Sequence, residues 1–200
     1  MARWISPRLR RHWFVASLAA LAVIVLGGLG AIVVYAGIYN IAADAPHTKA
    51  VYWLLEEVRE RSIAVRARDI IVPTDLKDQK RIAAGAAEYS EMCSQCHLAP
   101  GMEKTEISQG LYPRAPELSR GDPLTTAEQF WVIKHGIKAT GMPAWGPTHD
   151  DVLLWDIVAF VRTLPTLNSE QYEAVVKSAP EDHDQMMRHM PGMGDHDRHD

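Results

Sequence analysis

The sequence predicts an all-α protein composed of an N-terminal transmembrane helix, a helical stalk and a compact helical domain. No Lys, Arg, Asp or Glu occurs between Trp13 and Ala43, and apolar residues further along recur at the helical period. No strand pattern of any length is present. The chain is 47% hydrophobic and 23% charged with a net charge of -4, and it has no basic patch that would indicate nucleic-acid binding.

The apolar run Trp13–Ile38 is predicted to cross a membrane, because at about 1.5 Å per residue it exceeds a hydrocarbon layer of roughly 30 Å. The preceding residues 1–12 contain arginines and no acid. The positive-inside rule therefore places them in the cytoplasm and the rest of the chain in the periplasm, with a single pass through the inner membrane. A cleaved signal peptide is the alternative, with A-x-A at residues 43–45, but its apolar region would be unusually long.

Residues 39–74 are predicted to form a stalk containing a helix over Thr48–Asp69. One face of this helix is apolar, and it comprises Val51, Leu54, Leu55, Val58, Ser62 and Val65. Two uses of that face stay open. It packs on the following domain or the lipid surface, or it docks a partner membrane subunit. Pro73 ends the segment, and Thr74 or Asp75 can cap the next helix.

The next helix leads into the only two cysteines, Cys93 and Cys96, and His97 follows directly. Gly85, Tyr89 and Cys93 share one face of this helix, with the glycine allowing another helix to approach closely. A disulfide between cysteines so close in sequence would add little stability. A thioredoxin-type dithiol would need its first cysteine at a helix N-terminus, and a zinc site would need further ligands nearby. A chance pair beside a core histidine leaves the imidazole unexplained.

The remaining interpretation explains all three residues, since C-x-x-C-H is the attachment signature of a c-type haem. Two cysteines three apart can each form a thioether with one vinyl group, and the following imidazole can reach the iron. For the sixth iron position we expect Met142, in the glycine-bounded loop HGIKATGMPAWG. His135 and His149 are rival ligands that would give a bis-His iron.

The segment from about Asp75 to Leu167 resembles a class I mono-haem cytochrome c domain of the bacterial membrane-anchored kind. The resemblance rests on GAAEYSEMCSQCH, LYPRAPEL, EQFWVIKHGIKATGMPAWG and LLWDIVAFVRTLP. It implies one covalent haem c, with the thioethers on Cys93 and Cys96 and the iron between His97 and Met142.

The same resemblance implies roles around the haem. Pro116 and Leu118 would belong to a loop over the haem edge, and Trp131 would pack near the haem, where it can bond a propionate. The carbonyl that orients His97 is ambiguous between Pro113 and Pro116. The family also implies that Gly85 and Tyr89 cross Phe160 of the last helix.

Two further helices follow from local signals. Thr125 and Glu128 form a capping box for a helix that ends at Gly136, and Thr148 can cap a helix that ends near Pro165. A domain of residues 75–167 has a thin core unaided, so the apo-protein is expected to be poorly folded.

The expected function is one-electron transfer between redox donor and acceptor proteins, either free in the membrane or in a membrane respiratory complex. We expect no enzyme activity and assign no catalytic residue, because His/Met ligation uses both axial positions. The alternative functions are a haem-based gas sensor, in which Met142 is displaced, and a periplasmic copper-handling protein. The copper would bind the His/Met-rich tail at residues 168–200, which is predicted to be disordered.

Overall fold

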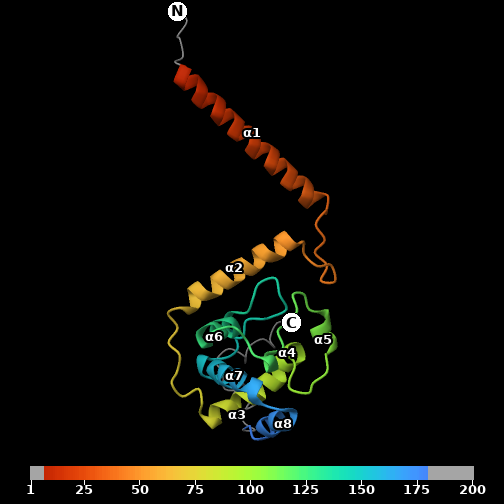
Figure 1. The fold of residues 1–200 in the computed structure, drawn as a ribbon, viewed down its shortest axis with the longest axis vertical. Helices are drawn as coiled ribbons and strands as arrows, with labels where there is room; N and C mark the ends of the chain where they lie inside the picture. Colours follow the sequence, from red (N-terminus) through yellow and green to blue (C-terminus); the bar gives the residue numbers. More distant parts are fainter. Residues whose placement is uncertain (1–6, 180–200) are drawn as a thin grey trace, which may run out of the picture. The chain divides into compact units, whose positions relative to one another are not determined.

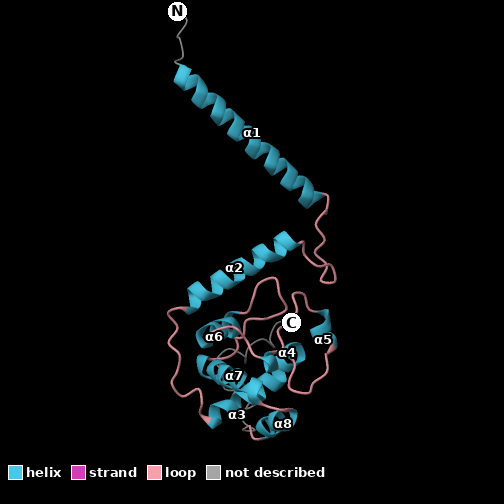
Figure 2. Ribbon diagram, in the orientation of Figure 1, coloured by secondary structure: helices cyan, strands magenta, loops and turns pink. Residues whose placement is uncertain are grey.

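The computed structural model describes residues 7–179, and this part contains helices and loops but no strand (Figure 2). The all-α prediction is confirmed. The chain divides into two compact units, one ending at Ala45 and the other beginning at Pro46.

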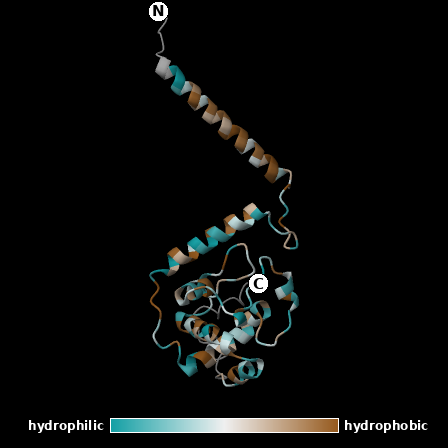
Figure 3. Ribbon diagram, viewed as in Figure 1, coloured by the Kyte–Doolittle hydropathy of each residue, from teal (hydrophilic) through white to brown (hydrophobic). Residues whose placement is uncertain are grey.

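The first unit is dominated by α1 (Pro7–Tyr35). Residues Arg10–Tyr35 of this helix are long and apolar enough to cross a membrane, and none of the apolar window is buried by the protein. In Figure 3 the ribbon of this helix has the colour of hydrophobic residues along most of its length. Exposure of so much apolar surface to water is unfavourable, so α1 is a candidate membrane anchor.

The second unit begins with α2 (Lys49–Ala67), whose first turn is capped by the Thr48 hydroxyl. The helix is present where the apolar period predicted one. Its buried residues are Ile63 and Ala67, which lie on the side that faces α6 (Thr126–His135). Most of the predicted apolar face is exposed instead, at Leu54, Leu55, Val58 and Val65.

The chain then enters α3 (Gln79–Glu88), capped by Asp78, and continues through a π-helical turn (Tyr89–Cys93) into α4 (Ser94–His97). α3 packs along α7 (Asp151–Thr163). A Cβ on Gly85 would collide with the Asp156 carbonyl, so the two backbones touch at this point. The Tyr89 and Phe160 rings lie 5.3 Å apart between centroids, at the crossing that the sequence resemblance implies.

The capping box predicted for α6 is present, with Thr125 and Glu128 each satisfying the other's backbone N–H, and the helix ends at Gly136. The predicted cap of α7 needs correction. Asp150, not Thr148, caps this helix by accepting a hydrogen bond from the Leu153 N–H. The Thr148 hydroxyl instead donates to the Trp145 carbonyl within the preceding turn.

The short helices α5 (Glu106–Gly110), η2 (Leu118–Arg120) and η3 (Leu164–Thr166) connect the longer ones. α8 (Ser169–Lys177) lies in the segment for which composition predicted disorder from residue 168 onward. A capping box between Asn168 and Gln171 begins this helix, and Tyr172 packs against the core. The His/Met-rich residues 180–200, which would bind copper under the alternative function, lie outside the described residues.

The core of the second unit lies where α3, α6 and α7 meet (Figure 1). Leu154, Ile157, Val158 and Phe160 of α7 are fully buried there. α7 contributes buried residues around its whole circumference, which is possible because α3 and α6 pack against it from different sides.

Candidate functional site

The two thiols and the imidazole of the C-x-x-C-H sequence lie on the wall of one cavity. The π-helical turn ends at Cys93, and the single turn of α4 then carries Cys96 and His97. Both thiols are free and half-buried. Burial raises the pKa of the Cys93 thiol to about 12, with smaller contributions from Glu88 and Cys96, so this thiol is protonated at neutral pH.

The His97 ring is oriented by a main-chain carbonyl. Its Nδ1 lies 2.9 Å from the carbonyl oxygen of Pro116, which can only accept, so Nδ1 carries the hydrogen. Nε2 is then the lone-pair nitrogen, the form needed to bind a metal. Burial lowers the pKa of His97, which also favours the neutral ring. Of the two prolines left open by the sequence, Pro116 is the one whose carbonyl reaches the imidazole.

The cavity has a volume of about 740 Å³, within the range of small-molecule and cofactor sites. Its wall is mostly apolar. Pro116 and Leu118, which the resemblance placed over the haem edge, both line it, and so does Met142.

Met142 is held in place by the backbone of the loop that follows α6. The Ile137 N–H donates to the Met142 carbonyl at 3.3 Å, and the Thr140 hydroxyl accepts from the Met142 N–H at 3.1 Å. Gly136 has φ +63, and a Cβ there would collide with the Pro143–Ala144 backbone. The glycine therefore lets the chain return close to the end of α6 and bring Met142 to the cavity.

The rival ligands lie elsewhere. His149 is buried with its Nε2 3.8 Å from the Glu88 carboxylate, and its ring packs edge-on to Trp145. His135 is exposed at the end of α6. Both residues are described by the structure, and neither belongs to the cavity wall.

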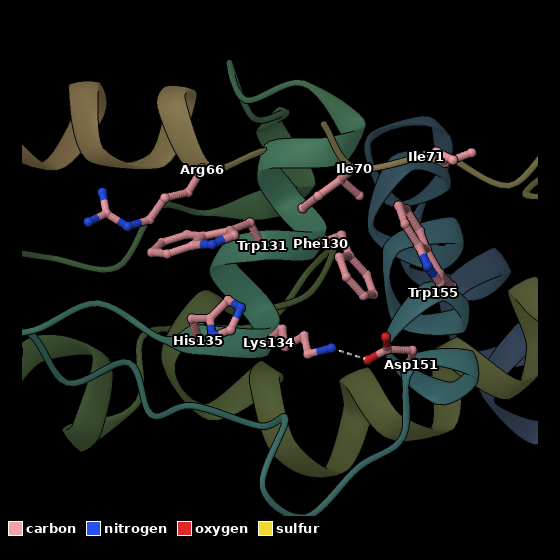
Figure 4. A pocket seen from close by; sticks show the side chains of 9 residues that line it. All are labelled: Arg66, Ile70, Ile71, Phe130, Trp131, Lys134, His135, Asp151 and Trp155. Carbon is pink, nitrogen blue, oxygen red and sulfur yellow. Dashed lines mark hydrogen bonds and ion pairs between the residues drawn. The ribbon is translucent and has the colours of Figure 1, made fainter. Parts of the chain in front are cut away.

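Trp131 lies in a different place from the one that the resemblance implied. It lines a second groove of about 420 Å³, where its ring contacts the His135 ring at 4.9 Å between centroids. Figure 4 shows both rings on the side of α6 that faces Arg66 of α2, with Lys134 paired to Asp151 beside them. In this structure Trp131 is not a member of the cavity wall.

Sequence reasoning missed the contribution of α2. Five of its residues line the cavity, and they are Tyr52, Glu56, Arg59, Glu60 and Ile63. They recur at the helical period and therefore share one face. The signal was present in the spacing, but four of the five are polar, so a search for an apolar stripe selected the opposite face. Arg59 pairs with Glu56 at 3.0 Å, and Arg114 adds a second guanidinium to the wall.

The residues present fit a haem c on three observations. The cavity is large and mostly apolar, its wall carries two adjacent thiols, and the Nε2 of a neutral imidazole is left to bind iron. Two arginines in the same wall could balance the negative charge of propionates.

Comparison with known proteins agrees with this fit. Residues 80–161 match the family model described as cytochrome C oxidase, cbb3-type, subunit III. No curated protein and no solved structure matches the chain. The matched segment contains the C-x-x-C-H sequence and Met142. The matched segment is a c-type cytochrome domain. Such a domain carries a haem c, an iron porphyrin that is covalently bonded to the protein.

Proposed function

We propose that this chain, whose residues 80–161 form a c-type cytochrome domain, is a membrane-tethered periplasmic one-electron carrier with His97 and Met142 as axial ligands. The observation that carries the proposal is that these two side chains line the same cavity as Cys93 and Cys96. When bound, the haem supplies a centre that cycles between ferrous and ferric iron. Both axial positions would be filled, which leaves no position for a substrate and is consistent with a carrier rather than an enzyme.

The protein residues have separate tasks in this proposal. Cys93 and Cys96 hold the cofactor as thioethers, while the Pro116 carbonyl fixes the His97 ring. The apolar wall residues, among them the buried Leu118, exclude water from the haem. A site without water disfavours the more highly charged ferric iron. The Met142 sulfur favours ferrous iron, so we expect a higher reduction potential than bis-His ligation would give.

The membrane tether and its orientation are part of the proposal. α1 meets the length and composition of a membrane span. Arginines precede the apolar run with no acid, which supports a cytoplasmic N-terminus and a periplasmic haem domain. The description of the matched family names an oxidase subunit, which supports a donor or acceptor in a membrane respiratory complex.

Substitution of the methionine tests the ligand assignment. In Met142→Ala we expect loss of the weak sulfur-to-iron absorption band of the oxidised protein and a lower midpoint potential, because the soft ligand is removed. Met102→Ala is the matched control, since Met102 is half-buried but is not on the cavity wall. Persistence of the band in Met142→Ala, or its loss in Met102→Ala, would contradict the assignment.

Carbon monoxide separates the carrier from the gas-sensor alternative. A methionine held by its own loop should keep the ligand position closed, so we expect no rapid spectral change when the gas is added to the reduced parent protein. The Met142→Ala variant should bind it quickly, which shows that the assay can detect an open position. Fast binding by the parent protein would favour the sensor.

A further inference from the structure

The two faces of α2 differ in their surroundings, because one faces the cavity and the other is exposed. Its inner face lines the cavity and buries Ile63 and Ala67. On its outer face Leu54, Leu55 and Val58 are 54%, 45% and 57% exposed, and Val65 is 55% exposed. The usual arrangement of a surface helix is therefore reversed, because polar side chains line the cavity while an apolar stripe is turned outward.

The charges of α2 are sorted in the same way. By the helical period, the half of the helix centred on Val58 carries Arg61 and Arg66 as its charged residues, while Arg68 follows the helix and pairs with Asp69 at 3.2 Å. The three glutamates of the helix fall on the other half. Arg61 does pair with Glu57 at 2.8 Å, but its side chain is 80% exposed, and a pair so exposed is weak enough to be exchanged for another anion.

A second copy of this chain does not complement the face. Val51, Leu55, Val58, Ser62 and Val65 follow alternating steps of four and three residues, the spacing of a coiled-coil stripe. In a parallel pair of such helices Arg61 of one copy would lie beside Arg66 of the other, and like charges repel there. An apolar stripe flanked by arginines is best matched by a partner that is both apolar and anionic.

We propose that the outer face of α2 lies in the headgroup layer of a membrane that contains anionic lipids. Val58 and its apolar neighbours would enter the boundary of the acyl chains, with Arg61 and Arg66 on lipid phosphates. The proposal rests on α1 being the membrane anchor of the proposed function. Residues 36–48 connect the two helices, and when extended they reach at most about 45 Å, so a helix tethered by them stays near the surface.

The consequence for function concerns the position of the cofactor. The cavity lies against the inner face of α2, and a helix with its side chains is about 10 Å thick. A haem in this cavity is then separated from the lipid surface by the thickness of one helix. This geometry fits electron exchange with a partner embedded in the membrane.

Spin labels on the full-length haem protein test the contact. Because Cys93 and Cys96 are consumed as thioethers, a cysteine introduced as Leu54→Cys or Val58→Cys is the only free thiol. Glu173→Cys on α8, where the side chain is 67% exposed, is the matched control. The proteins are placed in nanodiscs of phosphatidylethanolamine and phosphatidylglycerol, and collisions of each nitroxide with oxygen and with a water-soluble nickel chelate are measured by electron paramagnetic resonance.

We expect a several-fold higher ratio of oxygen to nickel collisions at positions 54 and 58 than at position 173. Equal ratios at all three positions would overturn the proposal, and so would shielding of positions 54 and 58 from both reagents, which indicates a protein contact. If the collision ratio at positions 54 and 58 were unchanged in discs of phosphatidylcholine alone, the proposed contact between the arginines and anionic lipids would be overturned. A variant is used only if its absorption spectrum equals that of the parent. Failure of the chain to enter discs at all would contradict the anchor itself, and is distinguished in this way from failure of the α2 contact.

Discussion

The contact between α3 and α7 differs from the wall of the cavity in how it is completed. At the contact, backbone touches backbone at Gly85 and Asp156, and the Tyr89 and Phe160 rings fill the adjoining space. Around the cavity, one side each of α2, α6 and α7 joins loops and the single turn of α4 to enclose about 740 Å³ that protein atoms leave open. The first region is a finished protein core, whereas the second is a shell that needs the cofactor as its centre.

The largest effect should come from withholding the haem. We expect the apo-protein, produced without haem attachment, to lose about 5 kcal/mol or more of unfolding free energy, since the apolar wall would face water. In hydrogen exchange, amides of α3 and α7 should stay protected longest, while α2 and the Met142 loop exchange fast. Uniform loss of protection over α3, α7 and the cavity wall would show that the two regions are not separable.

A substitution at the crossing of α3 and α7 should have the next largest effect. Gly85→Val would push the Asp156 backbone away, which we expect to cost about 3 kcal/mol by overpacking and to lower the yield of haem-loaded protein. Gly110→Ala is the control, because a Cβ there meets nothing within 4 Å and the change should be close to neutral. Equal unfolding midpoints in urea for the two variants would contradict the close packing.

An ion pair at the edge of the α3–α7 contact should show a smaller, pH-dependent effect. Arg81 donates to the Asp156 carboxylate at 2.5 Å, where the Asp156 side chain is 11% exposed. Burial raises the pKa of Asp156 despite Arg81, so Arg81→Met should raise it further. We expect a loss of about 2 kcal/mol at pH 7, since the buried carboxylate would have no cation.

The sign of the pH effect follows from the direction of that pKa shift. Below the ordinary pKa of 3.8 the Asp156 carboxyl is protonated in both folded and unfolded chains, so its contribution to the variant's loss vanishes. The loss grows as the pH rises from there through the raised pKa of the folded variant. Urea unfolding from pH 4 to pH 8 measures it, and Arg81→Met with Asp156→Asn should remove most of the pH dependence. A loss that is constant over this range would refute the assignment.

The smallest effect concerns the link between the two regions. The buried Tyr89 hydroxyl donates to the Leu98 carbonyl at 2.5 Å, directly after His97, and burial raises the pKa of Tyr89. Tyr89→Phe should cost about 1 kcal/mol through the lost hydrogen bond, with the sulfur-to-iron band retained. Tyr172→Phe, at the margin of the core, is the control. Loss of the band in Tyr89→Phe would mean that this hydroxyl positions the iron ligand as well.

The finished core was predictable because its signals are local or geometric. The spacing of Gly85 and Tyr89 predicts one face of a helix, and the Thr125 capping box predicts the start of α6. Both are present in the structure. The π-helical turn before Cys93 was not predictable, since it depends on how α3 ends against its neighbours. The start of α7 was misplaced because Thr148 and Asp150 are both good caps, and only the fold selects Asp150.

The cavity wall was predictable only in part. C-x-x-C-H and the methionine loop led to Cys93, Cys96, His97 and Met142, which meet in the structure. The period of α2 states which residues share a face but not which face the domain covers. The polar face of a helix can line a cavity when the cofactor bound there carries charged groups. Trp131 shows the converse limit, because a resemblance between sequences does not fix which side of a helix faces the cavity.

The loop that carries Met142 is closed by main-chain hydrogen bonds, from Ile137 to Met142 and from Trp145 to the Ile133 carbonyl at 3.2 Å. Lys138 and Ala139 at its tip are exposed and take no part in this closure. Lys138 is therefore a position where evolution or protein engineering can change the charge of the loop surface while the sulfur stays where it is, whereas the left-handed backbone of Ala139 (φ 58) narrows the choice of residue there.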